Sequence, residues 1–143
     1  MARRFPLAGL LRLRHAEQDR AAAALAAANE RLRDAADARI AARRNLADRE
    51  QTQPVTDAAT LSALAAARAS TRGMLEELDA VARTRRAEAD GAQAAYAAAR
   101  RAALGLEKLE GHHDREQAAA DLRAEQHALD EIAARRRTEG GAR

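Results

Sequence analysis

Two polar clusters in the C-terminal half of the chain have residue types that could do chemistry. The first is GHHDRE, residues 111–116, with two adjacent histidines and two carboxylates. On a helix His112 and Glu116 share a face because they are four residues apart, whereas the side chain of His113 diverges from it. A metal site needs more converging ligands than this. We therefore interpret the cluster as a solvated helix face and predict no metal site.

The second cluster is the triple arginine at residues 135–137, whose charge suits phosphates. No aromatic side chains alternate with these arginines for base stacking, and Asp130 and Glu131 come just before them. Arginine near a helix C-terminus also complements the helix dipole. We therefore predict no nucleic-acid partner, while a basic coiled coil that binds nucleic acid stays open as an alternative.

The composition is that of long helices rather than of a domain with a thick core. Hydrophobic residues make up 47% of the 143, but most of them are alanine, and aromatic residues are only 1%. The 25 basic and 22 acidic residues nearly balance. A chain dominated by alanine, glutamate, leucine and arginine is typical of a long helix or coiled coil.

The stretch QTQPVTD, residues 51–57, is the strongest predicted break. Pro54 disfavours helix at Gln53, and Thr56 or Asp57 can cap a new helix. We predict a first helix over about 7–51 and a turn region over 52–73. That region includes a short helix and a second break at ASTRG. A second long helix follows over about 74–137, and then a frayed tail over 138–143.

Two long helices joined by one turn region predict an all-α fold, an antiparallel coiled-coil hairpin that forms a single elongated domain over 1–143. Leu25 and Leu32 are seven residues apart, and Ala36 and Ile40 are expected to continue their face. The heptads look irregular, which predicts a weak supercoil. Alanine at many contact positions buries little area, so we expect modest stability.

The second helix should extend beyond the first. If the chain folds back at Pro54, the first helix ends near residue 118 of the second, and the stretch from about 120 to 137 overhangs. This stretch has Leu122, Leu129 and Ile132 on or near one face, which is typical of a partner site. Both ends of the chain are rich in arginine, so the end of the hairpin that carries the termini should be basic.

Catalysis is not predicted. The chain has no cysteine, no glycine-rich phosphate loop and no serine nucleophile motif. Its carboxylates lie on helices that form no concave pocket able to desolvate them. We predict a non-enzyme without catalytic residues or cofactors. No 18-residue stretch is free of charge, and no signal peptide follows Arg3-Arg4, so we expect a cytoplasmic protein with no direct membrane insertion.

Three stretches together point to a family. They are FPLAGLLRLRHAEQDRAAAALAAA at the start, YAAARRAALGLEKLEG in the middle and DLRAEQHALDEIAARRR near the end. The first has a phenylalanine before a Leu-Leu-x-x-Arg cluster, the second an aromatic residue before Leu-Glu-Lys-Leu, and the third Leu-Asp-Glu-hydrophobic-Ala-x-Arg. In this order they resemble the flagellar FliJ family, the stalk-like component of the flagellar type III export apparatus. Residues 50–75 carry none of the resemblance.

The resemblance implies an antiparallel two-helix stalk, similar to the central stalk subunit of rotary ATPases. It implies docking of the basic end in the pore of a hexameric flagellar export ATPase, and contacts with a membrane-embedded export gate protein and export chaperones. It also implies a peripheral place at the inner face of the cell membrane, at the flagellar base. The docking residues carried over from the terminal motifs are Leu10, Leu11, Arg14, Leu129, Asp130, Glu131, Ile132 and Arg135.

The gate and chaperone contact has no matching motif in this chain. Leu46, Leu75 and Leu78, near the expected tip of the hairpin, are the candidates for it. Tyr96 is the only aromatic residue of the shaft, whereas family members often have more. Two further alternatives stay open: the related stalk protein of virulence injectisomes, and a structural coiled coil that associates with itself through the overhanging stripe.

Overall fold

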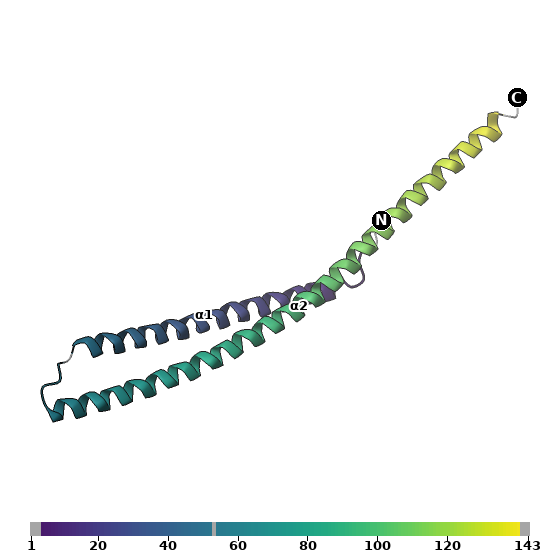
Figure 1. Cartoon of the computed structure of the whole chain (residues 1–143). Helices are drawn as coiled ribbons and strands as arrows, with labels where there is room; N and C mark the ends of the chain where they lie inside the picture. Colours follow the sequence, from purple (N-terminus) through teal and green to yellow (C-terminus); the bar gives the residue numbers. More distant parts are fainter. Residues whose placement is uncertain (1–3, 53, 141–143) are drawn as a thin grey trace. The chain divides into compact units, whose positions relative to one another are not determined.

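The computed structural model describes residues 4–52 and 54–140, and these form two long helices. Helix α1 spans Ala8–Thr52 and helix α2 spans Ala58–Gly140, with a short link between them (Figure 1). No strand occurs in the part of the chain that the structure describes. The prediction of an all-α fold built from two long, paired helices is confirmed. None of the described helices has an apolar run that would let it cross a membrane.

The link ends at a side-chain cap. The backbone N–H of Thr60 donates a hydrogen bond of 2.7 Å to Oδ1 of Asp57, directly before the first residue of α2. The hydrogen bonds from the Thr60 side chain and backbone hold the pKa of the Asp57 carboxyl below its usual range. Pro54 lies outside both helices, in agreement with the predicted break, and Gln53 lies outside the described residues.

The link is much shorter than the turn region that the sequence predicts. Helix α2 begins at Ala58 and continues through Gly73, so no second break occurs at ASTRG. Within that stretch the hydroxyl of Thr71 donates to the carbonyl of Ala67 at 2.8 Å, a bond made inside the helix. One glycine costs a helix about 1 kcal/mol relative to alanine, which weakens the helix without ending it. At the other end α2 reaches Gly140, and residues 141–143 of the expected tail lie outside the described residues.

The less exposed side chains of both helices recur at alternating steps of three and four residues. Every position of this series is buried or half-buried, and we name the positions a and d and call the series the seam. In α1 it comprises Leu11, Arg14, Gln18, Ala21, Leu25, Ala28, Leu32, Ala35, Arg39, Ala42 and Leu46. In α2 it comprises Thr71, Leu75, Leu78, Ala82, Arg85, Ala89, Ala92, Tyr96, Ala99, Ala103, Leu106, Glu110, His113 and Gln117. The heptad spacing is therefore regular, although the residue types are not.

Alanine dominates the buried part of the seam. The buried hydrophobic residues are Leu11, Ala28, Ala35, Ala82, Ala89 and Ala103. Small side chains let two helix backbones approach closely, but each contributes little buried area. The seam also corrects one expected face: Ile40 is 48% exposed, and the half-buried side chain at that level is Arg39.

The chain divides into two compact units: unit 1 comprises Met1–Glu17 and Ala99–Arg143, and unit 2 comprises Gln18–Ala98. In unit 2, Arg31 pairs with Glu88 at 3.7 Å and Arg43 lies 4.0 Å from Asp79, so the partner number falls as the number in α1 rises. The two helices of this unit are therefore antiparallel. Whether the two units form one elongated hairpin stays a prediction.

Unit 1 shows the same direction of pairing. The ring of Phe5 meets the ring of His113 edge-on, with centroids 5.7 Å apart, and Nε2 of His15 lies 2.7 Å from Oε1 of Glu107. Here too the later residue of the N-terminal segment meets the earlier residue of α2. The N-terminal segment thus runs antiparallel to α2 within this unit.

Candidate docking surfaces

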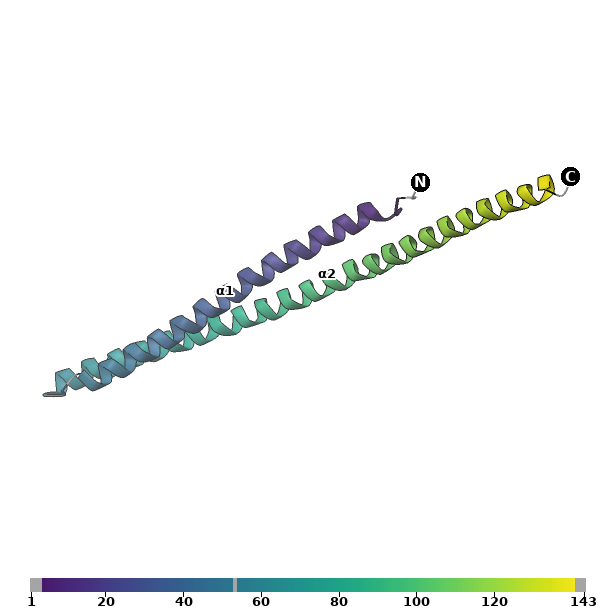
Figure 2. The ribbon, with the colours of Figure 1, turned by 90° about the horizontal axis from the view of Figure 1, so that it is seen from above.

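None of the described side chains in the C-terminal part of α2, residues 120–137 of unit 1, is buried. Every described side chain from Ala120 to Arg137 is exposed, and the last half-buried one before them is Ala119. In both views no part of the N-terminal segment of unit 1, residues 4–17, lies beside the yellow end of α2 (Figures 1 and 2). Leu122, Leu129 and Ile132 are 65%, 66% and 51% exposed. Such exposure of large apolar side chains on one stretch marks a candidate partner site.

These apolar side chains do not continue the seam. Counted from the a positions of α2, Leu122 and Leu129 lie at position f and Ile132 lies at position b. Position f is roughly 180° around the helix from the midpoint between a and d. The exposed apolar face of α2 therefore points away from the side on which the N-terminal segment packs in unit 1.

Position f of α2 differs between the two units. In unit 2 it holds only small residues: Ala59, Ala66, Gly73, Ala80, Ala87 and Ala94. In unit 1 it holds Arg101, Lys108, Arg115, Leu122, Leu129 and Arg136, and we call these six residues the outer line. All twelve are exposed. Sequence reasoning missed the outer line because it followed apolar residues alone, whereas the heptad count would have found it.

The predicted docking residues near the N-terminus have different surroundings. Leu11 is 6% exposed and lies in the seam, so its side chain supports the helix pairing. Leu10 is 39% exposed. The guanidinium of Arg14 donates a 2.8 Å hydrogen bond to Glu17, one turn further along α1. Of these three, Leu10 offers the most accessible apolar surface.

The predicted docking residues near the C-terminus all lie on the exposed part of α2. Leu129, Asp130, Glu131 and Ile132 are exposed, and Arg135 donates a 2.6 Å hydrogen bond to Glu131. The structure does not bring this group to the N-terminal one. Leu129 is 22 residues beyond Glu107, the partner of His15, which corresponds to about 33 Å of helix.

The candidates for the gate contact lie in unit 2. Leu46, Leu75 and Leu78 are half-buried at seam positions. Part of each side chain is therefore already covered by the pairing of the two helices. Two neighbours that sequence reasoning did not select are more accessible: Met74 is 53% exposed and Val81 is 44% exposed. Both lie at position g, directly beside the seam.

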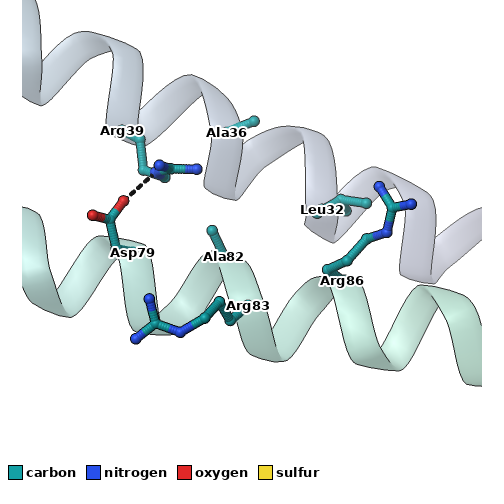
Figure 3. Close-up of a pocket in the computed structure, with 7 residues that line it drawn as sticks. All are labelled: Leu32, Ala36, Arg39, Asp79, Ala82, Arg83 and Arg86. Carbon is teal, nitrogen blue, oxygen red and sulfur yellow. Dashed lines mark ion pairs between the residues drawn. The ribbon is translucent and has the colours of Figure 1, made fainter.

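An arginine occupies a seam position in unit 2. Nε of Arg39 lies 2.5 Å from Oδ1 of Asp79, as Figure 3 shows, and the pair is about one-third exposed on each side. Nε is buried, and its approach to Asp79 is an ion pair rather than a directed hydrogen bond. The groove around the pair, about 380 Å³, is open to solvent. It therefore does not desolvate the carboxylate as a catalytic pocket would.

A second ion-pair group lies nearby in unit 2. Arg85 donates hydrogen bonds to both carboxylate oxygens of Glu88, at 3.1 Å and 2.9 Å. These bonds hold the pKa of Glu88 below its usual range, and the charges of Arg85 and Arg31 act in the same direction. The carboxylate is thereby kept ionised as a structural partner.

The histidine cluster has the geometry of a helix surface. Nδ1 of His112 lies 3.5 Å from Oε1 of Glu116, and both side chains are about two-thirds exposed. His113 lies in the seam against Phe5, and its Nδ1 is buried 3.6 Å from Oδ1 of Asp114. Within the described residues no three histidine, cysteine or carboxylate side chains converge as metal ligands would.

Comparison with known proteins gives one match. The model of the family described as flagellar FliJ protein matches residues 3–140 of the chain. No curated protein and no solved structure matches it. The matched range covers nearly the whole chain and includes the overhang, the outer line and the seam. The chain therefore belongs to the flagellar FliJ protein family and is a component of the flagellar export apparatus.

Proposed function

We propose that this protein is the stalk that docks in the hexameric flagellar export ATPase and couples it to the membrane export gate and to export chaperones. The family match favours the flagellar system over the related injectisome. In this proposal the stalk has no catalytic step of its own. It acts at the inner face of the cell membrane by transmitting changes of the ATPase ring along α2.

The exposed C-terminal part of α2 is the observation that carries this proposal. Leu129 and Ile132 project from a helix that continues without interruption from the part of unit 1 where the N-terminal segment packs. Full burial of one such side chain in a partner contributes about 1.5–3 kcal/mol. Asp130, Glu131 and Arg135 would form a polar rim around these anchors, as partner interfaces usually have.

The remaining proposed contacts would bury less apolar surface in a partner. Leu10 adds apolar surface near the N-terminus, while Leu11 and Arg14 would act chiefly by supporting the pairing of α1 with α2. On the gate side, we propose that Leu46, Leu75 and Leu78 hold the seam. The exposed Met74 and Val81 would then meet the gate or a chaperone.

Binding of the purified full-length chain to its cognate export ATPase, measured by calorimetry, tests the proposal. We expect the double variant Leu129→Gln/Ile132→Gln to weaken binding at least tenfold, because both anchors lose their buried area. Leu61→Gln is the matched control, since Leu61 is also an exposed leucine of α2, at 55%, but lies in unit 2. No binding by the wild-type chain, or equal loss in the control, would overturn the docking proposal.

A further inference from the structure

The outer line has a composition that helix pairing does not explain. All six side chains are exposed at position f, where no contact among the described residues of unit 1 selects the residue type. The same position of the same helix is alanine or glycine throughout unit 2. Alanine already satisfies a solvent-facing helix position. The two exposed leucines, set among four cations, are therefore available for a contact outside the chain.

Charge is segregated around this part of α2. On the face formed by positions b, c and f, from Arg101 to Arg136, the only acidic residue is Glu125. The other acidic residues of the same stretch lie at positions a, e and g. They are Glu107, Glu110, Asp114, Glu116, Asp121, Asp130 and Glu131. The face that carries the outer line is thus basic and apolar, and it complements an acidic and apolar partner.

The order of residues along the outer line resembles an interface with a centre and a rim. Leu122 and Leu129 are adjacent members of the line, and Arg115 and Arg136 flank them. Desolvated apolar anchors surrounded by charged residues are the usual arrangement at a protein contact. Neighbouring members are seven residues apart, about 10.5 Å along the helix, which is also the heptad spacing of a partner helix.

We propose that the outer line is a docking surface for an acidic amphipathic helix of a partner protein, lying lengthwise along α2. Leucines of that helix would pack on Leu122 and Leu129. Its carboxylates would pair with Arg101, Lys108 and Arg115 on one side and with Arg136 on the other. This proposal goes beyond the proposed function: the outer line shares only Leu129 with the proposed ATPase-docking residues, and it extends the contact surface of α2 toward Arg101.

A protein helix fits the outer line better than an anionic membrane. A helix that lies in a membrane interface needs apolar residues along its whole buried face. Here position f is apolar only at Leu122 and Leu129 and is charged at the three positions before them. The apolar block is thus two heptads long, which matches the core of a helix contact rather than a continuous lipid-facing stripe.

The test uses the full-length chain and a synthetic helical peptide, with binding followed by fluorescence anisotropy. The peptide has leucines on one face over two central heptads, and glutamates at the same position in the heptads before and after them. A second peptide with lysine in place of each glutamate is the charge control. We expect the acidic peptide to bind with a steep salt dependence and the basic peptide to bind at least tenfold more weakly.

Substitutions in the chain test which residues form the contact with the acidic peptide. We expect Leu122→Gln/Leu129→Gln to weaken acidic-peptide binding by about tenfold or more for each leucine, and Lys108→Glu/Arg115→Glu to weaken it about tenfold at low salt. Ala80→Glu/Ala87→Glu is the matched control, because it places the same charges at position f of the same helix in unit 2. Equal loss in this control, or equal affinity for both peptides, would overturn the proposal.

Further measurements distinguish the proposed partner helix from other occupants of the outer line. They also distinguish the outer-line proposal from the proposed docking in the ATPase. Binding of the chain to phosphatidylglycerol vesicles but not to the acidic peptide would replace the protein helix by a lipid surface and overturn the proposal. Sedimentation that shows a dimer abolished by Leu122→Gln/Leu129→Gln would assign the outer line to a second copy of the chain, and would also overturn the proposal.

If Lys108→Glu/Arg115→Glu abolishes binding of the acidic peptide but leaves ATPase binding intact, both proposals are supported. Acidic-peptide binding by a chain that fails to bind the ATPase would support the outer line and overturn only the docking in the ATPase.

Discussion

The two units use the same helix in opposite ways. In unit 2, α2 has Ala82 and Ala89 buried against α1 and only small residues along position f. In unit 1, residues 120–137 of α2 have no buried side chain, and position f carries Lys108, Leu122 and Leu129 among others. One stretch is thus specialised for pairing within the chain, and the other leaves large side chains exposed. The seam holds the two helices together, while the opposite face takes no part in this pairing.

The largest expected effect contrasts two alanines at position a of α2. Ala89 is 5% exposed, whereas Ala124 is exposed in the C-terminal part. We expect Ala89→Glu to lower the free energy of unfolding by about 3 kcal/mol, because it places an unpaired charge in the seam. Ala124→Glu should change it by less than about 0.5 kcal/mol. Urea unfolding followed by circular dichroism measures both, and similar losses would contradict the contrast between the units.

A smaller effect is expected at the arginine in the seam of unit 2. Arg39→Ala removes the ion pair with Asp79 and should lower the free energy of unfolding by about 1 kcal/mol. Arg39→Leu should cost less, because an apolar side chain suits a seam position, but it should loosen the register of an alanine-rich seam.

Disulfide cross-linking between single cysteines on the two helices of unit 2 measures this register. The cysteines are placed either in register or one heptad out. We expect out-of-register cross-links to appear in Arg39→Leu but not in Arg44→Leu, whose arginine lies at an exposed position f of α1. Cross-links confined to the native register in both variants would show that Arg39 does not specify it.

A still smaller and local effect is expected at low pH, at the start of α2. Because hydrogen bonds from Thr60 lower the pKa of Asp57 in the folded state, the cap stabilises the helix above the usual pKa range of aspartate. This stabilisation should be lost as the pH falls below about 4, toward the lowered folded pKa. Amide hydrogen exchange at residues 58–61 measures the fraying. Asp57→Asn keeps a capping side chain that does not titrate, and it should abolish the pH dependence.

The smallest expected effect on the fold comes from the outer line. Leu122→Gln/Leu129→Gln should leave the free energy of unfolding within about 0.5 kcal/mol of the wild type, because both side chains are already in water. Leu11→Gln is the contrast within the same unit, since Leu11 is in the seam and its replacement should destabilise the pairing. A markedly lower unfolding temperature in the double variant would mean that these leucines pack within the chain.

Much of the fold could be predicted from residue types, while the contacts could not. The long helices follow from the alanine-rich composition, and the break follows from Pro54, which acts through local backbone sterics. The expected second break at Gly73 does not occur, because a single glycine lowers helix stability by less than the surrounding helix formers supply. The apolar side chains of the overhang were recognised, but their position opposite the seam required the phase of the heptad.

What the sequence determined by itself is the helical class, the break near Pro54, the family motifs and the excess of apolar residues near the C-terminus. Only the tertiary structure decided which side chains face each other. A seam with a 3.5-residue period passes from Leu32 to Arg39 and leaves Ile40 in solvent, because seven residues return to the same face whereas eight rotate away from it. A charged residue such as Arg39 can occupy a seam position when the aliphatic part of its side chain packs in the seam and Asp79 lies opposite its guanidinium. Both conditions depend on the other helix, so the local sequence does not predict them.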